Sequence, residues 1–121
     1  MSMNKLILIR GIPGSGKSTL AKTYKGYEHL EADMFFYHEG QYLFNPMFLS
    51  IAHKWCLDTT AKMLKAGKSV VVSNTFIRKA DMEPYINLGY PIEIIEAKGN
   101  YKTVHNVPEE KIQFMKDMYE K

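Results

Sequence analysis

Short runs of apolar residues alternate along this chain with segments in which apolar residues recur at helical spacing. The strand candidates are residues 6–9, 27–30, 69–72 and 91–96, and residues 6–9 form a continuous apolar run, which is typical of a strand covered on both faces. Strands that alternate with helices indicate an α/β layer fold with a parallel sheet. The pattern therefore predicts a small parallel four-stranded sheet flanked by helices.

The longest predicted helix begins at Asn45 and Pro46, which suit the N-cap and the first helical position, and it stops at Gly67. We expect His53 to pack beside the apolar face of this helix. That face is predicted to consist of Phe48, Ile51, Ala52, Trp55, Thr59 and Met63. Three shorter helices are predicted at residues 18–24, 79–88 and 108–119. An aromatic-rich loop is predicted at residues 34–44.

A complete phosphate-binding pattern, G-x-x-x-x-G-K-[ST], lies between the first strand and its helix, at residues 11–18. Its glycines let the backbone turn sharply and approach phosphate oxygens, and its peptide N–H groups form a nest for anions. Lys17 supplies a positive charge to the β- and γ-phosphates, and the Ser18 hydroxyl is placed to bind Mg²⁺. We therefore expect ATP or GTP, with Mg²⁺, to be bound by Gly11, Pro13, Gly14, Ser15, Gly16, Lys17, Ser18 and Thr19.

The carboxyl ends of parallel strands meet at one edge of a sheet, where ligands of open α/β folds bind. The loop at residues 11–18, the region of Asp33 and residues 73–75 should therefore converge on one crevice. From chemistry alone, Asp33 can act as a base for an acceptor hydroxyl, hold Mg²⁺ through water, or only cap a turn. Asn74 is a candidate nucleotide contact, and Arg78 either reaches the crevice as a catalytic arginine or faces water.

Length and composition favour a single small domain that spans residues 1–121. A net charge of +3 is too mild to argue for nucleic acid by itself. The single cysteine, Cys56, cannot form an internal disulfide and is expected to be a buried, reduced thiol. Since no stretch approaches the length of a membrane span, we expect a cytoplasmic protein without a membrane partner. The oligomeric state stays open.

Several further segments carry a family resemblance: residues 32–36, 42–49, 72–75, 82–85 and 105–108. Together with residues 10–19, they resemble the small ATP-binding proteins of the Nedd-four-binding-protein-two-like group. Those proteins are similar to the kinase domain of phage polynucleotide kinases and are often labelled AAA-type ATPases. The resemblance covers nearly the whole chain and implies a polynucleotide-kinase-like P-loop NTPase fold. It places Lys17 and Ser18 at the phosphate and Mg²⁺ positions, and Asp33 at the carboxylate that activates the acceptor hydroxyl.

The chain departs from the kinase pattern at three places. Asn74 stands where polynucleotide kinases carry a second carboxylate, and Phe76 stands where the family has asparagine. The segment between Glu96 and His105 is far shorter than the lid helix that kinases close over ATP, which implies a reduced lid. Lys98 or Lys102 would then replace the lid arginine as point charges.

Two functions are consistent with these residues. One is a kinase-like enzyme that transfers the γ-phosphoryl group of ATP to a nucleic-acid 5′-hydroxyl or to a small metabolite. The other is a nucleotide-binding regulatory module with little or no turnover. An aromatic group in the loop either stacks on a base of the acceptor or covers the core; it comprises Phe35, Phe36, Tyr37, Tyr42 and Phe44.

Overall fold

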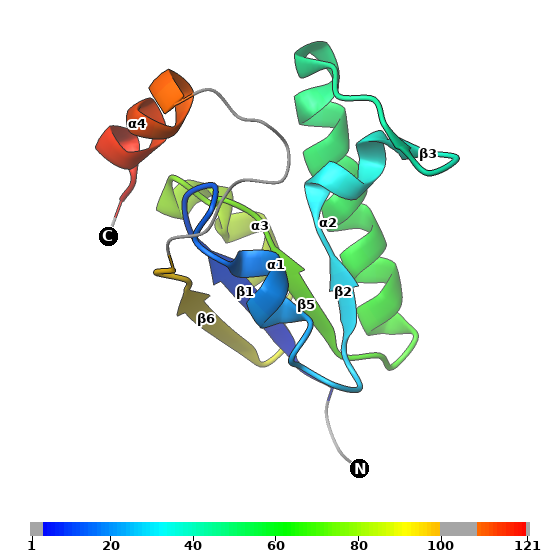
Figure 1. Ribbon diagram of the computed structural model, residues 1–121. Helices are drawn as coiled ribbons and strands as arrows, with labels where there is room; N and C mark the ends of the chain where they lie inside the picture. The colour runs from blue at the N-terminus through cyan, green and yellow to red at the C-terminus, as the bar shows by residue number, and fades with distance from the viewer. Residues whose placement is uncertain (1–3, 100–108, 121) are drawn as a thin grey trace.

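The computed structural model describes residues 4–99 and 109–120 and contains a parallel sheet with the strand order β2-β5-β1-β6 (Figure 1). The strands are β1 (Leu6–Arg10), β2 (Glu28–Leu30), β5 (Val70–Ser73) and β6 (Ile92–Glu96). Every pairing between them is parallel, and β1 lies between β5 and β6. The predicted four-stranded parallel sheet is confirmed.

Helices cover both faces of this sheet (Figure 1). On one face, Leu6 and Leu8 pack in a cluster with Ala52 and Cys56 of α2 (Leu49–Lys65), and α3 (Glu83–Ile86) adds Tyr85 to it. On the other face, a second cluster joins residues of β1 and β5 to α1 (Lys17–Ala21). Successive strand residues point to opposite faces, so a strand covered on both sides is apolar on both, as residues 6–9 of β1 are.

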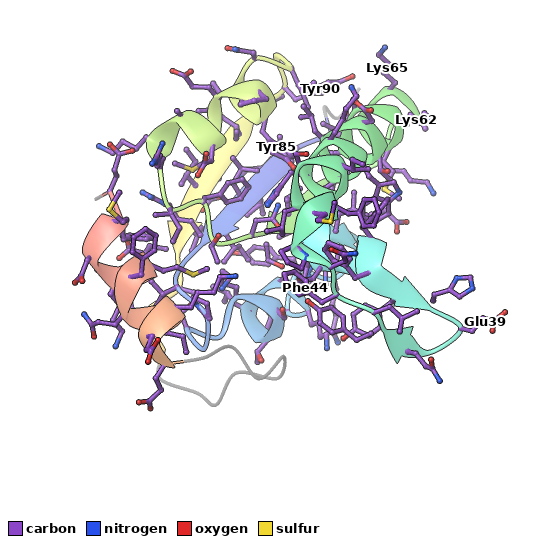
Figure 2. The ribbon with its side chains drawn as sticks, turned by 90° about the horizontal axis from the view of Figure 1, so that it is seen from above. Glu39, Phe44, Lys62, Lys65, Tyr85 and Tyr90 are labelled. Atoms are coloured by element: carbon purple, nitrogen blue, oxygen red, sulfur yellow. The ribbon has the colours of Figure 1, made fainter. Side chains whose placement is uncertain are left out.

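The boundaries of α2 follow the local signals in the sequence. The side chain of Asn45 accepts a hydrogen bond from the Met47 N–H at 3.0 Å, and Pro46 opens the short 3₁₀ turn η2 (Pro46–Phe48) that leads into the helix. Gly67, with φ of 87°, follows the helix end in the left-handed region that glycine tolerates. In Figure 2, Lys62 and Lys65 extend outward from the last turns, where cations interact favourably with the helix dipole.

The predicted core face of α2 was partly wrong. The buried positions form an i, i+4 row, while Phe48 and Ile51 are 45% and 49% exposed and His53 lies at the surface. Trp55 is only partly buried, against the core and the ring of Phe35. The helix presents its smaller side chains to the sheet and to the segment after β2, which lets the backbones approach closely. The buried row is Ala52, Cys56, Thr60 and Leu64.

The segment predicted as a loop contains regular structure. A 3₁₀ helix, η1 (Ala32–Phe36), is followed by a small hairpin of β3 (Tyr37–His38) and β4 (Gln41–Tyr42). Glu39 and Gly40 form its turn with φ of 50° and 81°, the left-handed conformations that a tight hairpin turn requires. Figure 2 shows Glu39 at the hairpin tip, away from the sheet.

The predicted helix at residues 79–88 is divided into a 3₁₀ turn, η3 (Lys79–Asp81), and α3, with Pro84 in the first turn of α3. The last helix, α4 (Glu109–Met118), confirms the closing helix. The segment predicted as a shortened lid lies largely outside the described residues. Lys102 and His105 are among the residues that are not described. In the part of the chain that the structure describes, no helix is long and apolar enough to cross a membrane.

Candidate nucleotide-binding site

The predicted phosphate-binding loop connects β1 to α1 at the carboxyl edge of the sheet (Figure 1). Gly14 and Gly16 have φ of 83° and 88°, a conformation in which most side chains would be strained. The Ser15 N–H donates to the Ile12 carbonyl at 3.1 Å and closes the turn. Beyond Gly16 the first N–H groups of α1 have no carbonyl in the preceding helical turn, so they suit an anionic ligand.

Gly11 is required by packing within the loop. A Cβ at this position would lie 2.4 Å from Ser15 Oγ and 2.8 Å from the Ala97 carbonyl oxygen. The segment after β6 runs against the loop here, since the Ala97 N–H donates to the Arg10 carbonyl and the Gly99 N–H to the Ser15 carbonyl, both at 2.8 Å. The contacts of Gly11 thus give a reason for glycine other than the close phosphate approach that the motif predicts.

Lys17 lies within the loop, with its ammonium donating to the Ile12 carbonyl at 3.0 Å. Burial lowers the pKa of Lys17 to about 8, an effect that the nearby Glu31 and Asp33 carboxylates partly oppose. The two carboxylates therefore lie close enough to Lys17 to act on its charge. A phosphate beside the ammonium would favour the protonated form further.

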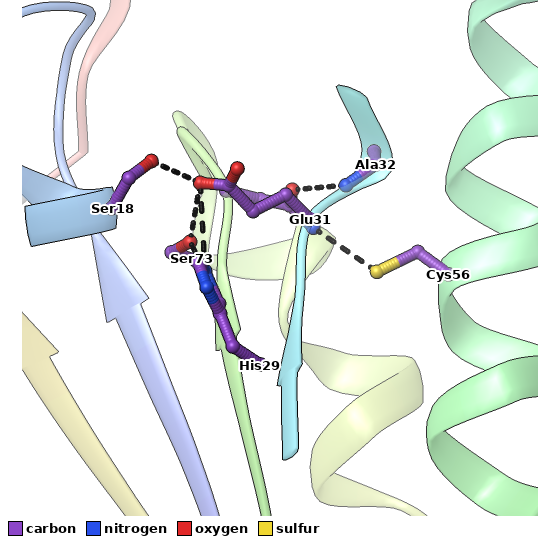
Figure 3. Close-up of polar contacts among 7 residues, drawn as sticks. Ser18, His29, Glu31, Ala32, Cys56 and Ser73 are labelled. Atoms are coloured by element: carbon purple, nitrogen blue, oxygen red, sulfur yellow. Dashed lines mark hydrogen bonds and ion pairs between the residues drawn. The ribbon is translucent and has the colours of Figure 1, made fainter. Parts of the chain in front are cut away.

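Glu31, directly after β2, is the carboxylate that contacts Ser18 (Figure 3). Its Oε2 accepts hydrogen bonds from the Ser18 hydroxyl and from Ser73 Oγ, the latter at 2.7 Å, and lies 3.6 Å from His29 Nε2. Burial by itself raises the pKa of Glu31, but the nearby His29 imidazole and the hydrogen bonds from Ser18 and Ser73 outweigh it and lower the pKa to about 2. Sequence reasoning missed this residue, although its place at a strand end was a usable signal.

Asp33 lies one turn further, in η1, and its Oδ1 accepts a hydrogen bond from the Tyr42 hydroxyl at 3.0 Å. This contact joins the predicted catalytic carboxylate to the β3–β4 hairpin. The rings of Phe36, Tyr42 and Phe44 pack on one another beside it, with 5.1 Å between the Phe36 and Phe44 centroids. Asp33 thus lies at the boundary between the phosphate-binding loop and an aromatic surface.

Asn74 is buried behind the two carboxylates. Its Oδ1 accepts a hydrogen bond from the Ala32 N–H at 2.8 Å, and its Nδ2 lies 3.8 Å from the buried thiol of Cys56. Since Ala32 separates Glu31 from Asp33, the Asn74 amide holds the backbone that carries both. The structure therefore places Asn74 as a support of the site; its predicted contact with nucleotide stays a prediction.

The two arginines lie apart from the cluster around Glu31. Arg10 is buried and donates to the Phe76 carbonyl from Nε at 3.2 Å and from Nη2 at 2.8 Å, with its guanidinium 4.3 Å from the Tyr119 ring centroid. Arg10 therefore has a structural role. Arg78 is exposed and lines a groove of about 300 Å³ between η3 and α4. The exposed ammonium of Lys98 pairs with Glu96 at 3.5 Å.

Phe76 occupies a backbone position that favours asparagine. Its φ is 44°, in the left-handed region where asparagine is enriched and an aromatic side chain is strained. Burial of its ring against Tyr85, in an edge-to-face contact of 5.5 Å, offsets that strain. The asparagine that the resemblance predicts at this position would suit the conformation, and Phe76 makes a core contact instead.

The donors at this edge fit Mg²⁺ together with a polyphosphate. A serine hydroxyl beside an ionised carboxylate supplies the oxygen ligands that Mg²⁺ prefers. Within residues 4–99 and 109–120, no group of three or more acidic, histidine or cysteine side chains could hold a metal unaided. A magnesium ion here would take its remaining ligands from phosphate and water, as it commonly does. The Ser15 hydroxyl, buried and without a hydrogen-bond partner among the described residues, adds an unsatisfied polar atom to the loop.

A phosphate-binding loop after the central strand of a parallel sheet, with carboxylates at the neighbouring strand end, defines a kinase-like P-loop fold. The chain belongs to the AAA domain family, whose profile matches residues 6–98. The resemblance predicted from the motifs is thereby confirmed.

Known proteins support this assignment. The chain is 31% identical over 134 residues to human NEDD4-binding protein 2, a match that covers 96% of this chain and 8% of that protein. It is 33% identical over 88 residues to the "Putative bifunctional polynucleotide kinase/RNA ligase" of Autographa californica nuclear polyhedrosis virus, covering 61% and 13%. The chain thus corresponds to a small part of each relative. A gluconokinase from Sinorhizobium meliloti 1021 shares the fold, with a TM-score of 0.68, 18% identity and coverage of 100% and 78%.

Proposed function

We propose that this protein is a Mg²⁺-dependent phosphotransferase that moves the γ-phosphoryl group of ATP to a hydroxyl acceptor. The observation that carries the proposal is the place of Asp33, which lies in η1 shortly after β2, at the same end of the parallel sheet as the phosphate-binding loop with Lys17. Kinase chemistry needs both groups, a cation at the phosphates and a carboxylate for the acceptor. A nucleic-acid 5′-hydroxyl is the first acceptor to test, because one relative is named a polynucleotide kinase; small metabolites are the second.

In this mechanism the loop N–H groups hold the phosphates and the Lys17 ammonium interacts with the β- and γ-phosphates. Asp33 accepts the proton of the acceptor hydroxyl. The oxygen of that hydroxyl bonds to the γ-phosphorus, the bond from the γ-phosphorus to the bridging β–γ oxygen breaks, and ADP leaves. The Tyr42 hydroxyl orients the Asp33 carboxylate for this step. Ser18 would hold Mg²⁺, with Asp33 in contact with the ion through water, and a bound ion would supply neutralisation of the phosphate charge. Arg78 stays a candidate for stabilising the transferred group.

One observation favours the second candidate, a nucleotide-binding module with little turnover. Arg10 is engaged with Phe76 and Tyr119, and Arg78 lies in the groove beside α4. The contacts described for the two guanidinium groups are thus to Phe76, to Tyr119 and to the groove beside α4, all outside the phosphate-binding loop. An arginine at the transferred phosphoryl group accelerates such reactions by orders of magnitude.

The test is transfer from γ-labelled ATP, with Mg²⁺, to 5′-hydroxyl DNA and RNA oligonucleotides and to a panel of small hydroxyl compounds. We expect Asp33→Asn to lower transfer by about 100-fold or more, with ATP affinity within about threefold of the original. Lys17→Ala should abolish the thermal shift caused by Mg²⁺–ATP. Asp58→Asn, an exposed change on α2, is the matched control and should change neither.

Two results would contradict the proposal in different ways. Background transfer with intact ATP binding would favour the regulatory module. An unchanged thermal shift in Lys17→Ala would exclude the loop as the nucleotide site and with it both candidates.

A further inference from the structure

We propose that Glu31 is the carboxylate of the Mg²⁺ site, supplied by the residue directly after β2 where the end of β5 carries none. This inference rests on the proposed function, since it concerns the metal that accompanies the nucleotide. The resemblance to polynucleotide kinases predicts a carboxylate after β5, at the position of Asn74, and Asn74 is instead buried behind the site. Glu31 is the carboxylate that contacts the Ser18 hydroxyl.

The contact between Ser18 and Glu31 is compatible with a metal on Ser18. A hydroxyl has one proton to donate and two lone pairs to offer. Ser18 can therefore keep donating its proton to Glu31 while its oxygen binds Mg²⁺. The carboxylate then draws the Ser18 proton toward itself, makes the oxygen a better ligand and adds negative charge beside the cation.

The arrangement of the sheet explains why the side chain is a glutamate. β5 lies between β2 and β1 in the strand order, so a β2 side chain must cross the end of β5 to reach the helix after the β1 loop. Ser73, the last residue of β5, is small enough to leave that path open. Its hydroxyl also donates to Glu31 Oε2 at 2.7 Å. An aspartate would be one methylene shorter and would not span the same gap.

A second contact holds the carboxylate in place. Ser73 Oγ lies 2.7 Å from His29 Nε2, and Ser73 uses its own proton for Glu31, so the imidazole Nε2 is the donor to Ser73. His29, Ser73 and Glu31 thus form a hydrogen-bonded chain that ends at Ser18 (Figure 3). Ser73 and His29 act as positioning residues for Glu31, in the way that neighbouring groups orient metal-binding side chains.

The test measures metal dependence of nucleotide binding and needs no turnover. Calorimetry compares the affinity for ADP in Mg²⁺ with that in EDTA, and electron paramagnetic resonance follows the binding of Mn²⁺ in the presence of ADP. In the unaltered protein we expect Mg²⁺ to tighten ADP binding. In Glu31→Gln this gain should fall about tenfold, with the affinity in EDTA within about threefold of the original.

Further variants sharpen the test. Glu31→Asp should lose most of the gain as well, because its carboxylate is too short, and it also serves if Glu31→Gln fails to fold. In Ser73→Ala the increase in ADP affinity caused by Mg²⁺ should be about threefold smaller, with the ADP affinity in EDTA unchanged. Asp33→Asn, which changes at most a contact through water, should lose less of the gain than Glu31→Gln. Glu28→Gln, on the same strand but paired with Lys68 at the surface, is the matched control and should keep the full gain.

The outcomes separate this inference from the proposed function. The inference alone would be overturned if folded Glu31→Gln kept the full increase in ADP affinity caused by Mg²⁺. It would also be overturned if Asp33→Asn lost this increase while Glu31→Gln kept it. ADP binding with no Mg²⁺ dependence in the unaltered protein would also overturn it, while the loop would remain the nucleotide site. No binding of any nucleotide would overturn the proposed function together with the inference.

Discussion

Glu31 lies in an inner region of the site, among Ser18, His29 and Ser73, where only 20% of its side chain is exposed and hydrogen bonds converge on one oxygen. Asp33, two residues further along the chain, lies in an outer region with Tyr42 and the β3–β4 hairpin. The inner region consists of polar groups held by the sheet. The outer region consists of aromatic side chains on a small hairpin and on the segment that leads to α2.

Under the proposed function, this difference would separate two tasks of a kinase site. Groups that bind phosphate and metal need fixed positions, which the hydrogen bonds between strand ends provide. Groups that meet an acceptor need access, which the exposed side chains around the hairpin provide; Tyr37 is 50% and Phe44 41% exposed. Glu31 and Asp33 are only two residues apart, yet they lie in different regions. The Asn74 side chain holds the backbone between them through the Ala32 N–H.

The largest expected contrast between the regions is in stability. At pH 7, Glu31→Gln should lower the free energy of unfolding by about 2 kcal/mol, because it disrupts hydrogen bonds to a buried charge, and Asp33→Asn by less than about 1 kcal/mol. The folded pKa of Glu31, about 2, is below its ordinary value of 4.5. The stabilisation is therefore complete above pH 4.5 and is lost as the pH falls toward 2.

Urea unfolding at pH 7 and pH 3 measures both parts of this contrast. The difference between the unaltered protein and Glu31→Gln should shrink at pH 3. If Glu31→Gln and Asp33→Asn lowered the free energy of unfolding equally at pH 7, the two regions would not differ in stability.

A second contrast concerns protons at the inner region. With a pKa of about 8, Lys17 is about three-quarters neutral at pH 8.5 in the free protein. Binding of ADP places negative charge beside it and raises its pKa, so about 0.7 proton should be taken up per ADP at pH 8.5 and about 0.1 at pH 7. Calorimetry in two buffers of different ionisation enthalpy measures this uptake.

The same lysine predicts how stability changes with pH in the free protein. Between pH 8 and 10.5 the unfolded chain binds more protons at Lys17 than the folded chain, so this residue contributes stability that rises with pH in that window. Lys54→Met, an exposed change on α2, is the control and should leave the proton uptake unchanged. An uptake at pH 8.5 no larger than at pH 7 would show that Lys17 is fully charged before binding.

The smallest effect is expected on the outer side of α2. Phe48→Ser and Ile51→Ser should each cost about 1 kcal/mol or less, because both side chains are roughly half exposed. Leu64→Ala, on the buried row of the same helix, should cost about 2–5 kcal/mol. Chemical unfolding compares the three. If Phe48→Ser or Ile51→Ser lowered the free energy of unfolding nearly as much as Leu64→Ala, the core face predicted from the sequence would be supported after all.

Features set by neighbouring residues were predictable. The buried run of β1, the glycines of the loop and the Asn45 cap of α2 each depend on a few adjacent positions. The hairpin was missed because its turn places Glu39, a residue with a side chain, in the left-handed region. The core face of α2 was partly misplaced because two overlapping sets of residues both fit the helical period, and packing against the sheet selected the smaller side chains.

Glu31 illustrates what only the tertiary structure decided. Its partners Ser18 and Ser73 are 13 and 42 residues away in the chain, and no local pattern relates them. The amino-acid sequence by itself determined the parallel sheet, the phosphate-binding loop and the family, because periodicity and the loop motif are local properties. The order of the strands decided which carboxylate meets Ser18, since β5 separates β2 from β1 and a side chain must be long enough to cross it.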